Sequence, residues 1–150
     1  MGINAVIDTN VWISALLNPH GYLALLRASF EAGKFQAVIS PPLLEELVDV
    51  LQRPRIKDKY RISPEDIEEL VVLIEEKCKT VIIMGEMTIC RDKDDNRVIE
   101  TAVAGGAQYI VTRDDDLKRD EVVIDFLSRQ GICVVTVGNF LQYLGISRDE

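Results

Sequence analysis

The stretch Ile3–Asn10, INAVIDTN, sets the pattern on which the fold prediction rests. A short apolar run ends in an acid, Asp8, and polar residues that can begin a helix follow at once. Continuous apolar runs, in place of alternating ones, are typical of strands buried on both faces of a parallel sheet. The stretch therefore predicts a strand over Asn4–Asp8 that leads directly into a helix starting near Val11.

The same pattern recurs along the chain. Further short runs rich in Val and Ile predict strands at Ala37–Ser40, Val81–Met84, Tyr109–Thr112 and Cys133–Val137, with helical patterns between them. This alternation predicts the α/β class, with a parallel sheet sandwiched by helices. Because no internal repeat, low-complexity tract or Pro/Gly-rich linker interrupts it, we expect a single domain over residues 1–150.

Several helix boundaries are also predicted. Ser40 and Ser63 each precede a proline, which places an N-cap residue before a first helical position that needs no N–H. Asp66 stands three residues after Ser63, as in a capping pair. Gly105-Gly106 is expected to end a helix over residues 96–104.

Composition restricts the class of protein. The chain has 150 residues, 47% of them hydrophobic, which is enough for a core without disulfide staples. Its net charge of −8 argues against a general electrostatic coat for nucleic acid. Any activity on nucleic acid therefore requires a local basic patch or bound cations.

The chain gives no signal for a membrane or for secretion. Its longest apolar runs, such as Leu70–Ile74, are far shorter than the roughly 18 residues of a membrane span. No charged n-region precedes the first strand, and Cys78, Cys90 and Cys133 are scattered. We therefore expect a cytoplasmic protein with ordinary thiols and no membrane partner.

One charge run opposes the acidic balance of the chain. Residues 53–61 carry a net charge of +4, because one acid, Asp58, stands among five bases, namely Arg53, Arg55, Lys57, Lys59 and Arg61. One interpretation is a solvated loop between two helices. The other is a strip that contacts RNA phosphates, with Tyr60 available to stack on a base.

Two acids have informative positions. Asp8 closes the first strand, where ligands collect in open α/β sheets, although it can equally cap the following helix. Glu46 lies just beside an apolar arc formed by Leu43, Leu44, Leu47, Val48, Val50 and Leu51 when the helix is plotted at about 100° per residue. It is either an acid that leans toward a cleft or a surface acid at a helix margin.

Two further groups of acids lie at element ends. Asp92, Asp94 and Asp95 precede a helix, and Asp114–Asp116 follow the strand that ends near Thr112. Capping accounts for one acid at the helix start, and three consecutive carboxylates repel one another unless a cation lies among them. Oxygen ligands without paired His or Cys suit Mg²⁺ or Mn²⁺, whose chemistry includes phosphodiester hydrolysis.

With these segments in place, the chain resembles a PIN-domain ribonuclease, in particular the PIN toxins of prokaryotic toxin–antitoxin pairs, known as VapC-like proteins. Four segments carry the resemblance, and they have the order and spacing of that family: Val6–Val11, Ile39–Leu47, Asp92–Asn96 and Gly106–Leu117. The resemblance implies a three-layer α/β/α sandwich around a parallel sheet.

The resemblance also implies roles for individual residues. The acids that match the family's catalytic set are Asp8, Glu46, Asp95, Asp114 and Asp116, of which all except Glu46 are expected to hold the metal. Asp95 is preferred over Asp92 because of its distance from Thr101-Ala102, so Asp92 and Asp94 are expected in an outer shell. Residues expected to orient the acids through hydrogen bonds are Asn10 and Thr112.

The activity implied is hydrolysis of RNA by metal-activated water, with Mg²⁺ or Mn²⁺ as cofactor. The resemblance further implies an antitoxin protein that covers the acids, and a homodimer. Two alternatives stay open: a PIN-like module that binds RNA or protein without cutting, and an aspartate-based phosphatase. The phosphatase is disfavoured because Asn10 stands where such enzymes place a second Asp.

Overall fold

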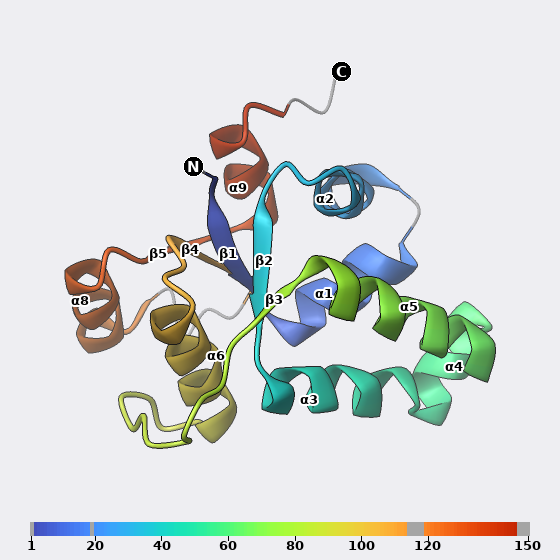
Figure 1. Ribbon diagram of the computed structural model, residues 1–150, viewed down its shortest axis with the longest axis horizontal. Helices are drawn as coiled ribbons and strands as arrows, with labels where there is room; N and C mark the ends of the chain where they lie inside the picture. The colour runs from blue at the N-terminus through green and yellow to red at the C-terminus, as the bar shows by residue number, and fades with distance from the viewer. Residues whose placement is uncertain (1, 19, 114–118, 147–150) are drawn as a thin grey trace.

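A five-stranded parallel sheet organises the molecule (Figure 1). The computed structural model describes residues 2–18, 20–113 and 119–146. The strand order is β3-β2-β1-β4-β5, and the strands are β1 (Asn4–Ile7), β2 (Gln36–Ile39), β3 (Lys79–Thr80), β4 (Tyr109–Val111) and β5 (Cys133–Val135). Every neighbouring pair is parallel. The parallel sheet is therefore confirmed.

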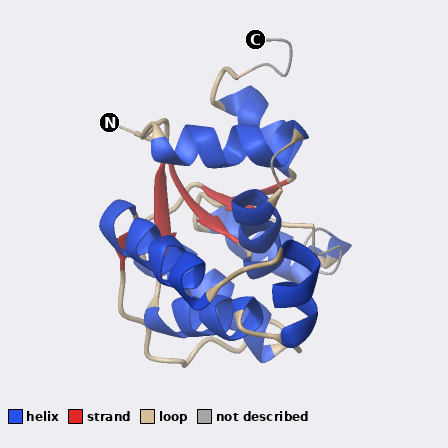
Figure 2. Ribbon diagram, turned by 90° about the vertical axis from the view of Figure 1, so that its right-hand side faces the viewer, coloured by secondary structure: helices blue, strands red, loops and turns tan. Residues whose placement is uncertain are grey.

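Helices cover both faces of this sheet (Figures 1 and 2). The described helices are α1 (Thr9–Leu17), α2 (Gly21–Glu31), α3 (Pro41–Leu51), α4 (Pro54–Tyr60), α5 (Pro64–Lys77), α6 (Lys93–Ala104), α8 (Glu121–Arg129) and α9 (Val137–Tyr143). Helices α6 and α8 pack on one face, and α1, α2 and α9 form the layer on the other. Helix α3 contacts both α1 and α6, so it joins the two layers at the carboxyl ends of β1 and β2. The three-layer α/β/α prediction is confirmed.

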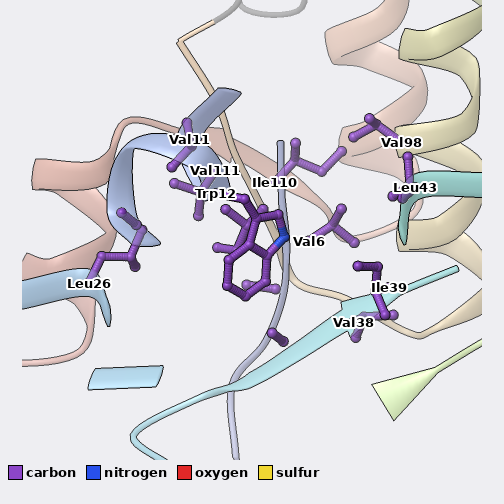
Figure 3. Packing of buried hydrophobic residues seen from close by; sticks show 14 of the residues in the cluster. Val6, Val11, Trp12, Leu26, Val38, Ile39, Leu43, Val98, Ile110 and Val111 are labelled. Atoms are coloured by element: carbon purple, nitrogen blue, oxygen red, sulfur yellow. The ribbon is translucent and has the colours of Figure 1, made fainter. Parts of the chain in front are cut away.

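The core explains why these short strands hold together. Val6, Val38 and Ile110 on the central strands are fully buried, and side chains from both helical layers pack around them (Figure 3). Aromatic rings extend the packing on the α1/α2/α9 side, where Phe35 meets Phe140 with ring centroids 4.9 Å apart. Burying apolar surface of this kind is the dominant favourable term in folding. Among the described residues, no helix is both long and apolar enough to cross a membrane.

The position of β3 corrects one prediction. The expected strand Val81–Met84 is instead a two-residue strand, Lys79–Thr80, because β2 ends at Ile39 and α3 begins two residues later. The last bond to the sheet is donated by Val81 N to Ile39 O at 2.8 Å. Beyond it the chain has no strand to pair with, and Ile82 and Met84 are 72% and 75% exposed.

The connection that follows β3 is held by two side chains of α6. Glu100 accepts hydrogen bonds from the backbone N–H groups of Met84, Gly85 and Met87, at 2.8, 3.1 and 3.3 Å. Asn96 accepts from Cys90 N at 2.7 Å and donates to Cys90 O at 2.9 Å. These bonds satisfy backbone groups that no strand pairs with.

Helix boundaries give further corrections. Helix α6 begins at Lys93, not near residue 96, because Asp92 caps it and acids in the first turn are favoured by the helix dipole. Residues 54–60 form α4, so the basic run is a short helix and not a loop, although most of its basic residues are exposed to solvent. Gly105 is the C-cap of α6, which confirms the predicted end of that helix.

Candidate functional site

Asp8 lies where β1 passes into α1, and both of its carboxylate oxygens are held. Its Oδ1 accepts a hydrogen bond from Thr9 N at 2.9 Å, as expected of an N-cap residue. Its Oδ2 accepts from Thr112 Oγ1, at the end of β4, at 3.0 Å. The backbone continues the sheet, since Asp8 N donates to Val111 O at 3.0 Å. The carboxylate is thus fixed at the carboxyl ends of two central strands.

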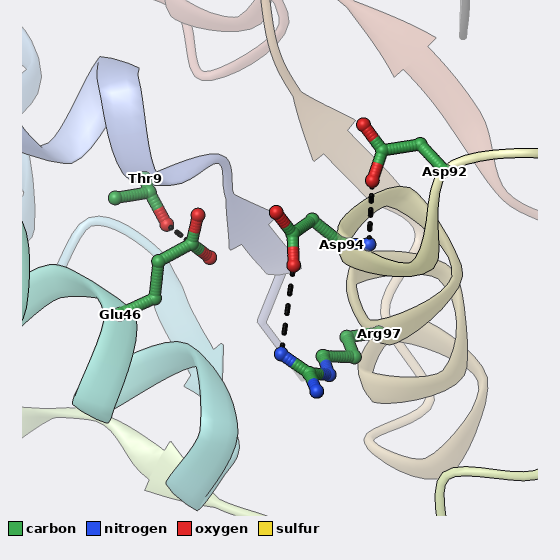
Figure 4. A network of polar contacts seen from close by, with 5 residues as sticks. All are labelled: Thr9, Glu46, Asp92, Asp94 and Arg97. Atoms are coloured by element: carbon green, nitrogen blue, oxygen red, sulfur yellow. Dashed lines mark hydrogen bonds and ion pairs between the residues drawn. The ribbon is translucent and has the colours of Figure 1, made fainter.

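Thr9 connects this carboxylate to a second one. While its backbone N–H donates to Asp8, its hydroxyl donates to Glu46 Oε2 at 3.1 Å, across 37 residues of sequence (Figure 4). Glu46 is half-buried in the middle of α3, and it leans toward α1 and α6. Glu46 is therefore turned toward neighbouring helices, and its role in a cleft stays a prediction.

The surroundings of Glu46 favour its protonated form. Burial raises the pKa of the Glu46 carboxyl, and the hydrogen bond from Thr9 opposes this by stabilising the carboxylate. The negative charges of Asp94 and Asp8 raise the pKa further, whereas Arg97 lowers it, and the net direction is upward. Several carboxylates therefore repel one another here, and a bound cation would relieve that repulsion.

Asp94 and Asp95 point in different directions from the first turn of α6. Asp94 shares a face of the helix with Arg97 and Thr101, which stand three and seven residues later, and it points toward Glu46 (Figure 4). Arg97 Nη1 lies 3.5 Å from Asp94 Oδ1. Asp95 instead shares a face with the buried Val98 and Ala102, which pack on the sheet.

Sequence reasoning did not show that Asp94 faces Glu46, and the outer-shell role of Asp94 stays a prediction. The signal that could have shown this direction is the buried Thr101, seven residues later on the same helical face. Thr101 contacts Ser40 at the start of α3, so that face of α6 is turned toward the helix of Glu46. Thr9 was missed as well, because a threonine after an acid carries no distinctive pattern.

The remaining predicted residues are distributed as follows. Asp92 caps α6, with its Oδ1 accepting from Asp94 N at 2.8 Å. Asn10 is exposed, and its side chain makes no hydrogen bond within the described part of the chain. Asp114 and Asp116 lie outside the described residues. Within residues 2–18, 20–113 and 119–146, no three His, Cys, Asp or Glu side chains are grouped closely enough to hold a metal ion.

The basic run is separate from these acids. Helix α4 lies at the end of α3 that is far from the sheet (Figure 1). Arg53 pairs with Asp49 at 3.2 Å, with both side chains largely exposed, and Lys59 Nζ lies 5.2 Å from the centroid of the Tyr60 ring. Exposed pairs of this kind contribute little to stability.

The fold and the site define a class: a three-layer α/β/α protein with acids at the carboxyl ends of central parallel strands. The chain belongs to the PIN domain family, whose model matches residues 4–116. The resemblance noted from the sequence is thereby confirmed.

Two known proteins extend this comparison. The uncharacterized protein MJ1680 of Methanocaldococcus jannaschii is 33% identical over 121 residues, which cover 79% of this chain and 77% of that protein. A similar chain is found among solved structures, in the crystal structure of VapBC2 from Rickettsia felis bound to a DNA fragment from its promoter. That likeness has a TM-score of 0.58 at 13% identity and covers 89% of this chain and 98% of that one. It shows that the two chains share a fold.

Proposed function

We propose that this protein is a metal-dependent ribonuclease that hydrolyses phosphodiester bonds with water. PIN domains are generally nucleases. The observation that carries the proposal is the bridge formed by Thr9, which joins the carboxylates of Asp8 and Glu46 where β1, α1 and α3 meet. Carboxylates at the strand ends of an α/β sheet stand where such folds bind their ligands.

The donor set fits a hard divalent cation. The acids proposed to hold Mg²⁺ or Mn²⁺ are Asp8, Asp95, Asp114 and Asp116, with Glu46 completing the catalytic set. All of them offer oxygen, which these ions prefer. The cation, when bound, activates water and stabilises charge on the phosphate oxygens.

The chain's own contribution is to orient these acids. Thr112 and the N–H of Thr9 hold one oxygen each of Asp8, so its carboxylate plane is fixed before any ligand arrives. The Thr9 hydroxyl holds Glu46 toward the same edge. Arg97 lies beside Asp94 and partly offsets the negative charge near Glu46.

The test is cleavage of labelled single-stranded RNA in Mg²⁺ or Mn²⁺ against EDTA. We expect Asp8→Asn, Asp95→Asn and Glu46→Gln each to lower the metal-dependent rate by about 10²-fold or more. Glu45→Gln is a matched control, because Glu45 is the neighbouring residue on α3 but is exposed. Cleavage that persists in the Asp8 and Asp95 variants would refute the proposed site.

We further propose that the protein is a toxin silenced by an antitoxin. The fold shared with a chain of VapBC2 and the excess of negative charge support a partner that presents a basic side chain to the acids. We expect the protein encoded beside it to abolish cleavage at equimolar ratio. Failure of that partner to bind would remove the toxin assignment and leave the nuclease assignment in place.

Two further surfaces belong to this proposal. The helix around residues 43–51 or the helix around residues 67–78 is proposed to supply a homodimer interface, and sedimentation at micromolar concentration tests whether a dimer forms. The basic run is proposed to contact the RNA backbone through Arg53, Arg55, Lys57, Lys59 and Arg61. Removing Lys57 and Lys59 together should weaken RNA binding and reduce its salt dependence.

The alternative is a PIN-like module that binds RNA or protein without cutting it. Metal binding without cleavage of any RNA would favour that module. The aspartate-based phosphatase is the weaker alternative, and release of phosphate from small phosphate esters would support it.

A further inference from the structure

A second feature adjoins the proposed site, on the other side of the start of α6. A cavity of about 380 Å³ lies between the N-terminal ends of α6 and α8. Its lining includes two Arg-Asp dipeptides, Arg91-Asp92 and Arg119-Asp120, together with Asp95. Residues far apart in sequence thus contribute the same pair of side chains to one cavity.

Each dipeptide is built in the same way. The aspartate caps a helix through one oxygen: Asp92 Oδ1 accepts from Asp94 N at 2.8 Å, and Asp120 Oδ1 accepts from Val122 N and Val123 N at 3.0 and 3.3 Å. The Oδ2 atoms of Asp92 and Asp120 accept no hydrogen bond from the described residues. Because capping already fixes each carboxylate, its second oxygen is a pre-oriented acceptor.

Asp95 connects the cavity to the proposed site. It lines the cavity, and it is one of the acids proposed to hold the metal. Its neighbour Asp94 points toward Glu46 (Figure 4). Because Asp95 belongs to both the cavity and the proposed site, we expect a nucleotide next to a phosphate held by the acids to lie close to this cavity.

The charges of the lining decide which part of a nucleotide it fits. Among the described lining residues, the two arginines are balanced by the capping aspartates Asp92 and Asp120, while Asp95 belongs to the proposed metal site, so these four side chains have no net charge to attract a phosphate group. A neutral group that both donates and accepts hydrogen bonds is suited to such a mixed lining. Cys90 and Val123 add apolar surface, and arginine side chains stack on flat rings.

Guanine meets these requirements best among the four bases. It presents O6 and N7 as acceptors for an arginine, and it carries N–H donors for a carboxylate. Sequence-specific proteins read such edges on unpaired bases, which are splayed out of the stack.

We propose that this cavity binds one unpaired base of the RNA, guanine in preference, and thereby selects where the chain is cut. The inference rests on the proposed nuclease function, and it adds a determinant of substrate choice. The arginines and capping aspartates recognise the base and take no part in the hydrolysis itself.

The test compares oligouridine strands with and without a single central guanine. Binding is measured by fluorescence anisotropy in EDTA at low salt, so that no cleavage interferes. We expect the wild type to prefer the guanine strand by about fivefold or more. The preference should fall toward one in Arg91→Ala and in Asp120→Asn, the latter of which retains a good capping side chain.

A matched pair on the same helix serves as control. Arg129 and Asp125 form an exposed ion pair on α8, 3.1 Å apart, so Arg129→Ala and Asp125→Asn should retain the preference. Equal binding of both strands by the wild type, or a preference that survives in the cavity variants, would overturn the proposal. A preference for another base would overturn the assignment of guanine.

Cleavage of a random RNA pool separates the two proposals. Metal-dependent cleavage without a base preference at the cut would remove the cavity's role and keep the nuclease. Guanine-selective binding that needs Arg91, in a protein that cuts no RNA with any metal, would keep the cavity and remove the nuclease.

Discussion

Helices α3 and α5 each begin with a proline that follows an N-cap serine, yet the two serines form different hydrogen bonds. Ser63 forms a full capping box: its Oγ accepts from Asp66 N at 3.1 Å, and Asp66 Oδ2 accepts from Ser63 N at 2.9 Å. Ser40 occupies the N-cap position of α3, but its hydroxyl makes no capping bond. It lies instead 2.8 Å from Thr101 Oγ1 on α6.

The direction of that second bond follows from the donors available. Thr101 Oγ1 donates its proton to Arg97 O at 2.7 Å, and a hydroxyl carries one proton. Ser40 is therefore the donor and Thr101 the acceptor. Both side chains are 0% exposed, so the bond is made inside the core. One serine stabilises its own helix, and the other joins the helix of Glu46 to the helix of Asp94.

The largest expected effect comes from a substitution that disturbs the packing of α6, the helix that Ser40 contacts through Thr101. An alanine Cβ at Gly105 would lie 2.3 Å from Val38 Cγ1, which is far too close, and Val38 is a buried, stiff β-branched residue. Gly105→Ala should therefore push α6 off β2 and cost about 1–3 kcal/mol, measured by urea unfolding. Gly138→Ala is the control, because its nearest atom would be 3.9 Å away. Equal stabilities of the two variants would contradict the close approach of α6 to β2.

The second test removes the hydroxyl of Ser40. Ser40→Ala leaves the buried Thr101 oxygen without its donor, which should cost about 1–2 kcal/mol and also lower RNA cleavage, because α3 and α6 lose a fixed contact. Unfolding and cleavage rates are measured on the same preparation. A loss of stability at full cleavage rate would show that the junction does not position Glu46.

The third test is the same substitution at the other helix. Ser63→Ala removes an exposed cap, so it should cost about 1 kcal/mol and leave RNA cleavage unchanged. The comparison between the two helices depends on this separation of stability from activity. Reduced cleavage in Ser63→Ala would show that α5 also supports the site.

The smallest expected effects are changes of stability with pH that depend on Glu46 on α3 and Asp66 on α5. The pKa of Asp66 is lowered by its hydrogen bonds with Ser63, so its contribution is present above the unfolded-state pKa and lost as pH falls. The pKa of Glu46 is raised, mainly by burial, so stability is lost as pH rises through its folded-state pKa.

As pH rises from acid to neutral in EDTA, the stability of Glu46→Gln relative to wild type should therefore increase. The stability of Asp66→Asn relative to wild type should decrease over the same range. Unfolding curves at several pH values measure both differences. If both variants shift in the same direction with pH, the assigned surroundings of one carboxyl are wrong.

Much of the fold could be predicted from sequence because burial and helix capping leave local signals. The parallel sheet followed from short, continuous runs such as Ala5–Ile7, and the Ser63 cap followed from its acidic partner. The strand after α5 was misplaced because its apolar residues, Ile82 and Met84, lie outside the sheet. Hydrophobicity alone does not show where a strand loses its neighbour.

The site was less predictable, because it depends on which helix faces meet. Asp8 and Glu46 were chosen as candidates by their positions, and the structure links them by hydrogen bonds through Thr9. The directions of Asp94 and Asp95 differ by one step around α6, and only the contact of Thr101 with Ser40 shows which step faces α3. That contact is tertiary and leaves no mark in the local sequence.

The hydrogen bonds between α6 and the connection after β3 affect which residues of this protein can be substituted. Glu100 and Asn96 form hydrogen bonds with backbone groups of the loop, at Met84, Gly85 and Cys90. The backbone path of the loop therefore does not depend on most of its side chains. Mutations can therefore accumulate at exposed positions such as Ile82 and Met84 without changing the backbone path. Substitutions on the loop's outer surface should thus disturb its backbone less than substitutions of Glu100 or Asn96.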